Sequence, residues 1–328
     1  MIATHTLTAP FAGADRPLWH WLASGRAAAL FAVLAGVSLA LMSRERRPMP
    51  GLVVRALLIA VLGLALGELD SGLAVILTYY GVLFLLGLPF LRLGARTLLA
   101  LAAAWAVAAP VAAHLLAPHL PAPTYGVPTF DRLDDPGRLL AELVLTGYYP
   151  VLLWLAYLLA GMAVGRLDLR RPGVDVRLLG WGAMLAVGAQ LLAEWLPPAE
   201  NAADYHGTIP SGADWDLLLV ADPHSGTPLD LATTTGSALA VTGLCLLVVR
   251  LLPRLGERAL AVGFGAGTMT LTLYSLHVLL HTQAWPPEDY GQAAFRAHVA
   301  VVLGLGAVCV ALRRRGPLEW LVRRASRR

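Results

Sequence analysis

The sequence contains no lysine and little charge of any kind. All 25 basic residues are arginine, and only 14% of the 328 residues are charged, whereas a soluble domain carries about 25%. Hydrophobic residues make up 57% of the chain, and the mean hydropathy is +0.65. These values exclude an ordinary soluble domain and predict a polytopic membrane protein. The arginine excess therefore relates to membrane topology, and no nucleic acid partner is expected.

Cysteine is also scarce. Cys245 and Cys309 both lie inside apolar segments, where a thiol behaves as a small apolar side chain. No disulfide or cysteine-based metal site is predicted. The N-terminus lacks a charged start followed by an apolar core, so no signal peptide is predicted. Residues 1–7 instead read as the end of a membrane helix, and we expect a longer gene product to supply the rest of that helix.

The fold class predicted by the apolar segments is all-α, a polytopic transmembrane helix bundle. A hydrocarbon core of about 30 Å needs about 20 apolar residues per helix. By that measure the chain has about nine spans, or ten if a truncated first helix is restored. They cover residues 25–42, 53–69, 73–90, 96–117, 149–166, 178–196, 233–252, 260–281 and 293–312.

The distribution of arginine orients these spans. Five segments, which alternate with the remaining loops, hold 20 of the 25 arginines and only 5 of the 21 acidic residues. Arginine-rich short loops stay in the cytoplasm, which predicts an external N-terminus and a cytoplasmic C-terminus. The five segments are residues 43–55, 91–96, 166–177, 250–258 and 313–328.

We treat residues 1–328 as one integral-membrane domain with an N-terminal half, 1–169, and a C-terminal half, 170–312. The largest predicted outer loop covers residues 197–231, and a structureless loop of that length is usually functional or disordered. The basic tail, residues 313–328, reads as an amphipathic segment that lies at the interface and meets anionic headgroups.

The densest polar cluster is Asp222–Ser237, which reads D-P-H-S-G-T-P-L-D-L-A-T-T-T-G-S before a long apolar segment. Helix capping accounts for one or two of these residues. The remainder includes His224, Ser225 and the carboxylates Asp222 and Asp230. They also suit a working site at a membrane surface, and both interpretations stay open.

A second polar stripe reads Y-S-x-H-x-x-x-H from Tyr274 to His281. The four-residue spacing places His277 and His281 on one helix face. They are either helix-end histidines bonded to nearby loops, or a buried general base or proton relay that lines a cavity. No metal site is predicted, because the glutamate of an H-E-x-x-H motif is missing.

Arg26 opens the first apolar span within S-G-R. An arginine there either anchors the helix end by reaching the interface or binds the phosphate or carboxylate of a ligand.

Several blocks resemble known membrane families. Ser24–Leu41 (S-G-R-A-A-A-L-F-A-V-L-A-G-V-S-L-A-L) resembles the early spans of bacterial heparan-α-glucosaminide N-acetyltransferase-like proteins. Thr146–Leu169 and Pro223–Val241 resemble actinobacterial members. Thr270–His277 (T-L-T-L-Y-S-L-H) and Arg315–Arg323 (R-G-P-L-E-W-L-V-R) are similar to the ending of the YeiB-type family of unknown function.

The resemblance implies a reaction. The characterised branch moves an acetyl group from cytosolic acetyl-CoA to a glucosamine amine across a membrane, with a histidine that follows the first transmembrane helix. The matching position here is His5. Acyl transfer needs a base or acyl carrier, for which His5, His224 and His277 are candidates. It also needs oxyanion donors, for which Ser225, Tyr274 and the N–H groups around Gly226 are candidates, and Arg26 could hold the donor.

The sequence thus predicts a multi-pass plasma-membrane acyltransferase that acetylates an extracytoplasmic sugar or cell-envelope glycolipid from acetyl-CoA. Predicted substrate-binding residues are Arg26, Asp222, Ser225, Asp230, Tyr274 and His281. Membrane lipids and the glycan or glycolipid acceptor are the expected partners, and a homo-oligomer stays open. The alternatives are a small-molecule transporter, which would favour internal repeats and broken helices, and a non-catalytic protein of envelope assembly.

Overall fold

The structure is a computed structural model that describes residues 2–7, 25–44, 49–121, 126–197, 215–283 and 291–326. This part of the chain is helical and contains no β-strand. The α-helices are α1 (Ile2–Thr6), α3 (Arg26–Arg44), α4 (Met49–Gly67), α5 (Leu77–Gly87), α6 (Ala95–Leu116), α7 (Pro136–Ala141), α8 (Val151–Arg166), α9 (Val174–Trp195), α10 (Pro228–Leu251), α11 (Arg254–Gly263), α12 (Thr270–Gln283), α13 (Gln292–Ala311) and α14 (Pro317–Ala325).

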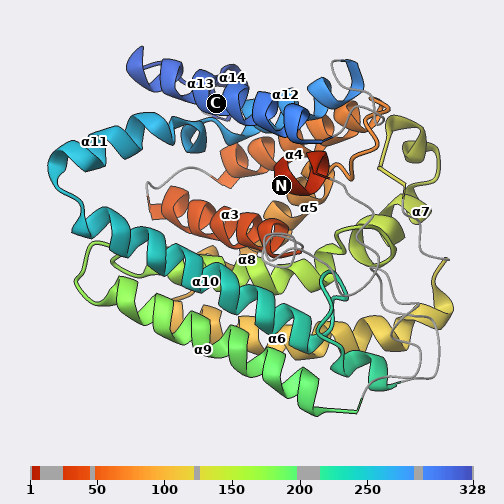
Figure 1. The fold of residues 1–328 in the computed structure, drawn as a ribbon. Coiled ribbons are helices and arrows are strands. Elements are labelled where there is room, and N and C mark those ends of the chain that lie inside the picture. Colours follow the sequence, from red (N-terminus) through yellow and green to blue (C-terminus); the bar gives the residue numbers. More distant parts are fainter. Residues whose placement is uncertain are drawn as a thin grey trace.

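Shorter turns of helix connect them. The 3-10 helices are η1 (Leu88–Arg92), η2 (Ala117–His119), η3 (Phe130–Asp134), η6 (Trp215–Leu219) and η7 (Gly265–Thr268), and η4 (Glu142–Thr146) is a π-helix. In Figure 1, α3 and α8 lie in the middle of the molecule. Helices α6, α9 and α10 lie on one side of them, and α12, α13 and α14 lie on the other.

Six helices within the described ranges are long and apolar enough to cross a membrane: α3, α4, α6, α9, α10 and α13. A seventh span results if α7, η4 and α8, which bend by 53° at their junction, are counted as one. The helix over Leu77–Arg92 is shorter than the span predicted there. Large apolar side chains of α9 are exposed, with Trp181 at 65% and Trp195 at 83%, which suits contact with lipid. The chain is therefore a multi-pass membrane protein.

The predicted span over residues 260–281 is wrong as a single helix. The chain forms α11, η7 and α12 there, with breaks at Gly263–Phe264 and at Met269. A Cβ added to Gly265 would lie 2.6 Å from the carbonyl oxygen of Gly306. The backbone of η7 therefore packs directly on α13. Glycine also lowers helix stability by about 1 kcal/mol. Gly263, Gly265 and Gly267 therefore favour a break in a segment whose hydropathy favours one continuous helix.

Helix α8 forms the centre of the core: every residue in it except Leu152 and Arg166 is buried. Its closest neighbour is α3, because glycines remove the side chains between them. A Cβ added to Gly161 would overlap the carbonyl oxygen of Val33, and one added to Gly36 would overlap that of Leu158. Small residues permit such close helix packing in membranes.

Arginine-rich helix ends meet one another. Arg44, at the end of α3, donates to the carbonyl oxygen of Arg166, at the end of α8, at 2.5 Å. Arg250, at the end of α10, forms a 2.7 Å ion pair with Asp175, which is fully buried at the start of α9. The contacts join segments that the arginine distribution assigned to one side of the membrane. Which side this is stays a prediction.

Candidate active site

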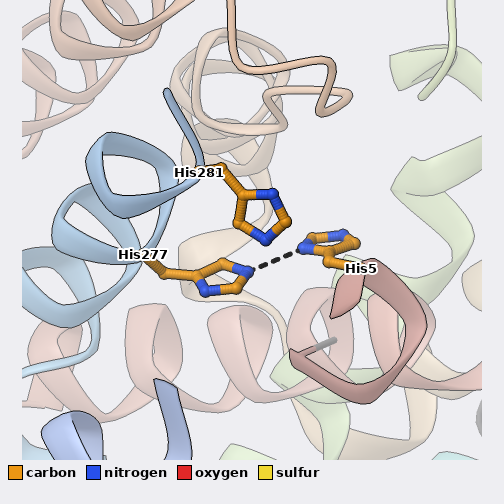
Figure 2. Close-up of side chains that lie close together, drawn as sticks. All are labelled: His5, His277 and His281. Atoms are coloured by element: carbon orange, nitrogen blue, oxygen red, sulfur yellow. Dashed lines mark hydrogen bonds between the residues drawn. The ribbon is translucent and has the colours of Figure 1, made fainter. Parts of the chain in front are cut away.

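Four histidines from three helices form a buried cluster, which we call the histidine cluster: His5 of α1, His277 and His281 of α12, and His298 of α13. His277, His281 and His298 are 4%, 2% and 1% exposed. Figure 2 shows the rings of His5, His277 and His281 turned toward one another. The prediction that His277 and His281 share a helix face is confirmed, with ring centroids 4.7 Å apart.

Hydrogen bonds link three of these rings in a row. His5 Nδ1 lies 2.9 Å from His277 Nε2, and His277 Nδ1 lies 2.7 Å from His298 Nδ1. A neutral imidazole has one N–H donor and one acceptor nitrogen. The N–H groups of the row can therefore all point toward His298 or all point toward His5. Switching between the two arrangements allows a proton to be lost at the His5 end while another is taken up at the His298 end. This is the geometry of a proton relay, one of the two interpretations that the sequence left open.

Sequence reasoning missed His298. Its signal was a lone histidine inside the apolar span over residues 293–312, and ionisable groups in spans are functional candidates by default. Its partner could not be read from the sequence, because His277 lies 21 residues away on another helix.

An open, mostly apolar groove of about 250 Å³ leads to the cluster. Ile2 of α1, Phe31 of α3, Val302 of α13, and Tyr274 and His277 of α12 are among its lining residues. The Tyr274 hydroxyl accepts a 3.2 Å hydrogen bond from the Ile76 backbone N–H. That bond orients the Tyr274 ring at the wall of the groove, which His277 also lines.

The predicted polar stretch forms a second cluster, around the turn Asp222–Gly226. Ser225 N–H donates to the carbonyl oxygen of Asp222 at 3.1 Å, and His224 has a φ of +69°. Proline at the second position and positive φ at the third fit a type II turn. A non-glycine residue is uncommon there, so the neighbouring contacts must hold His224 in place.

Asp230 supplies one of those contacts. It is 2% exposed, and its Oδ2 accepts a 3.0 Å hydrogen bond from Gly226 N–H. Thr227 caps α10 by accepting from Asp230 N–H at 3.1 Å, which confirms the capping interpretation for one residue. Ser225, 1% exposed, lies with its Oγ 3.3 Å from that of Thr227. Ser225 and Asp230 thus shape the turn that presents His224.

Arg26 lies beside this second cluster. Gly25, at φ +70°, packs so closely on Pro223 that an added Cβ would lie 2.8 Å from the proline Cβ. The Arg26 guanidinium attracts the Asp230 carboxylate, which also feels the negative charge of the exposed Asp222. Arg26 further lines an open apolar groove of about 670 Å³ between α3, α9 and α10.

The structure therefore divides the predicted site residues between two places. His5, His277, His281 and Tyr274 gather at the histidine cluster and its groove. Arg26, Asp222, His224, Ser225 and Asp230 gather around the turn before α10. The cavities at the two places have no lining residue in common. His5 and His277 are thus candidates for one chemical task, and His224 belongs to another location.

The histidine cluster offers ligand nitrogens for a metal ion. One nitrogen each of His5, His277 and His281 lies within 4.8 Å of the others. A tetrahedral zinc ion with bonds of about 2.0–2.1 Å holds its nitrogens about 3.4 Å apart. The three rings would have to draw together to bind it. The absence of a metal in the reaction stays a prediction.

The apolar helices and the imidazole row define a multi-pass membrane protein with a row of hydrogen-bonded histidines inside it. The family model described as heparan-alpha-glucosaminide N-acetyltransferase, catalytic, matches residues 1–189. The chain belongs to this family. The match includes α1 with His5 and α3 with Arg26, and it ends before α10, α12 and α13. No curated protein and no solved structure matches the chain.

Proposed function

We propose that this protein is a membrane acetyltransferase that uses the histidine cluster to acetylate an amine or hydroxyl of a sugar or glycolipid outside the cytoplasm. In the reaction the acceptor nitrogen or oxygen attacks the thioester carbonyl of acetyl-CoA. A C–N or C–O bond forms, the C–S bond breaks, and the CoA thiolate leaves. His5 removes the acceptor proton, which passes to the leaving thiolate, and His277 and His298 serve as its relay.

The observation that carries this proposal is the contact of His5 with His277. His5 lies within the part of the chain that matches the acetyltransferase catalytic model, and His277 lies outside it. Residues 272 positions apart meet at 2.9 Å in a buried place beside an open groove. A positioned base of this kind contributes about 10²–10⁴-fold to a proton-transfer step.

The second cluster is our candidate for acceptor binding. Arg26 can bind an anionic group, and the large groove that it lines is apolar enough for a lipid chain. The turn with His224 packs against Gly25, the residue before Arg26. These features favour a lipid-linked sugar as acceptor, with its phosphate at Arg26 and its sugar extending from there toward His5.

The test is transfer of radiolabelled acetyl from acetyl-CoA to glucosamine or glycolipid acceptors by the full chain in nanodiscs. We expect wild-type transfer, a loss of about 100-fold or more in His5→Ala, and a smaller loss in His224→Ala that appears in KM. Equal transfer by wild type and His5→Ala would overturn the assignment of His5. An absence of transfer with any acceptor would count against the acetyltransferase proposal itself.

Added Zn²⁺ is expected to inhibit the transfer, because it binds the imidazole nitrogens that the relay uses. Mg²⁺, which prefers oxygen ligands, serves as the control and should have no effect. The measurement is activity against free metal concentration, followed by a chelator that restores it. Loss of activity on chelation of the untreated enzyme would instead show that the reaction needs a metal.

One observation favours the transporter alternative. The break between α11 and α12 interrupts a predicted span, and broken helices often form transport sites. The assay in nanodiscs separates the two functions, because a transporter moves a solute without forming a new acetyl bond. Uptake into proteoliposomes without acetyl transfer would support transport.

A further inference from the structure

A basic pocket of about 410 Å³ lies at the other end of α12 from the histidine cluster. Its walls come from α4, η7, the end of α13 and α14. Four arginines and one carboxylate line it, together with Thr268: Arg55, Arg314, Arg315, Arg323 and Glu319. The basic tail, predicted to lie at the membrane surface, thus contributes three of these arginines to a cavity.

The one carboxylate of the lining is held by the start of α12. Glu319 Oε1 accepts from the backbone N–H groups of Leu271 and Thr272 at 2.7 and 3.1 Å. Its Oε2 accepts from the Thr272 hydroxyl at 2.6 Å. Glu319 therefore caps the N-terminus of α12, where negative charge is favoured. Arg314 and Arg315 line the same pocket, and paired arginines of this kind bind phosphate groups.

The pocket adjoins the groove that leads to the histidine cluster. Thr268 lines the basic pocket, while the preceding Ala266 and Gly267 line the groove. The groove then follows α12 from Thr270 to His277. Seven residues of α-helix rise by about 10 Å. A ligand with a phosphate-bearing end and a narrow flexible arm fits this path from arginines to imidazoles.

We propose that the basic pocket binds the phosphate groups of acyl-CoA, with the pantetheine arm in the groove and the thioester beside His277 and His5. This rests on the proposed acetyltransferase function and assigns a role to the R-G-P-L-E-W segment, Arg315–Trp320. Arg315 would contact the ligand, and Glu319 would fix α12 so that the groove and the pocket stay aligned.

Direct binding of radiolabelled acetyl-CoA to the full chain in nanodiscs of uncharged lipid tests the proposal. We expect Arg314→Gln/Arg315→Gln to bind at least about 10-fold more weakly than wild type, because two charge-assisted phosphate contacts are lost. The matched control is Arg324→Gln: Arg324 lies on α14, 5.4 Å above the Trp320 ring, and does not line the pocket. The control should bind as wild type does.

A second measurement needs no variant. Wild type should bind dephospho-CoA, which lacks the 3′-phosphate, more weakly than CoA. Nanodiscs with anionic phospholipid test a lipid headgroup as the occupant. In that case CoA and dephospho-CoA bind equally, and anionic lipid reduces the binding of both to the same extent. Equal binding of the two nucleotides, or wild-type binding by Arg314→Gln/Arg315→Gln, would overturn the proposal.

These binding results are separable from the fate of the proposed function. Arginine-dependent CoA binding without acetyl transfer would support the pocket as a nucleotide site and contradict the acetyltransferase function. If Arg314→Gln/Arg315→Gln transfers acetyl with an unchanged KM for acetyl-CoA, the acetyltransferase function is supported and the role of the pocket is contradicted.

Discussion

Replacing His277 with alanine is expected to reduce acetyl transfer by about 100-fold or more. His277 is the middle ring of the row: its Nε2 faces His5 Nδ1 at 2.9 Å and its Nδ1 faces His298 Nδ1 at 2.7 Å. Its removal takes away the ring that is hydrogen-bonded to His5, which we propose orients His5 and takes up its proton. The measurement is kcat for transfer of labelled acetyl, with binding of acetyl-CoA measured in parallel.

The double variant His5→Ala/His277→Ala gives the sharper result. If the two rings act as one unit, the double variant loses no more activity than the less active of the two single variants. The effects of residues in one catalytic unit are strongly non-additive. His114→Ala is the control, because His114 is also buried, at 5% exposed, but lies against Trp215 at the end of α6. Losses that multiply in the double variant would show that His5 and His277 act independently.

The hydropathy of the sequence predicted most of the fold. Long apolar runs without glycine clusters, such as those of α4 and α6, form continuous helices close to their predicted bounds. The run over residues 260–281 is also apolar enough to be predicted as a span but forms three pieces, because the η7 backbone packs on Gly306. A backbone contact between segments distant in sequence leaves no trace in a sliding average of hydropathy.

The site could be predicted only where one helix carries it. The spacing of His277 and His281 was enough to place them on one face. His5 became a candidate through a resemblance and not through spacing, and its contact with His277 could not be predicted because 272 residues separate them. The arginine pocket escaped prediction for the same reason. Glu319 is fixed by Leu271 and Thr272, 48 and 47 residues away. These contacts, together with the hydrogen bond from Leu318 N–H to the Thr272 hydroxyl, direct α14 toward α12.

Gly161→Val is expected to destabilise the folded protein by about 3 kcal/mol, the upper end of the usual cost of overpacking a core. Any Cβ at this position overlaps the carbonyl oxygen of Val33. That oxygen belongs to the backbone of α3, so no side-chain rotation can relieve the overlap and the two helices must separate. The thermal midpoint in detergent, followed by size-exclusion chromatography, measures the effect.

Gly188→Val is the matched control. Gly188 lies in the middle of α9, is exposed, and has no atom within 4 Å of an added Cβ. Both substitutions introduce the same β-branched side chain into a helix, so the difference between them isolates the contact of α3 with α8. A thermal midpoint for Gly161→Val equal to that of Gly188→Val would contradict that contact. Because α3 also carries Arg26 and Phe31, separation of the two helices would disturb both clusters together.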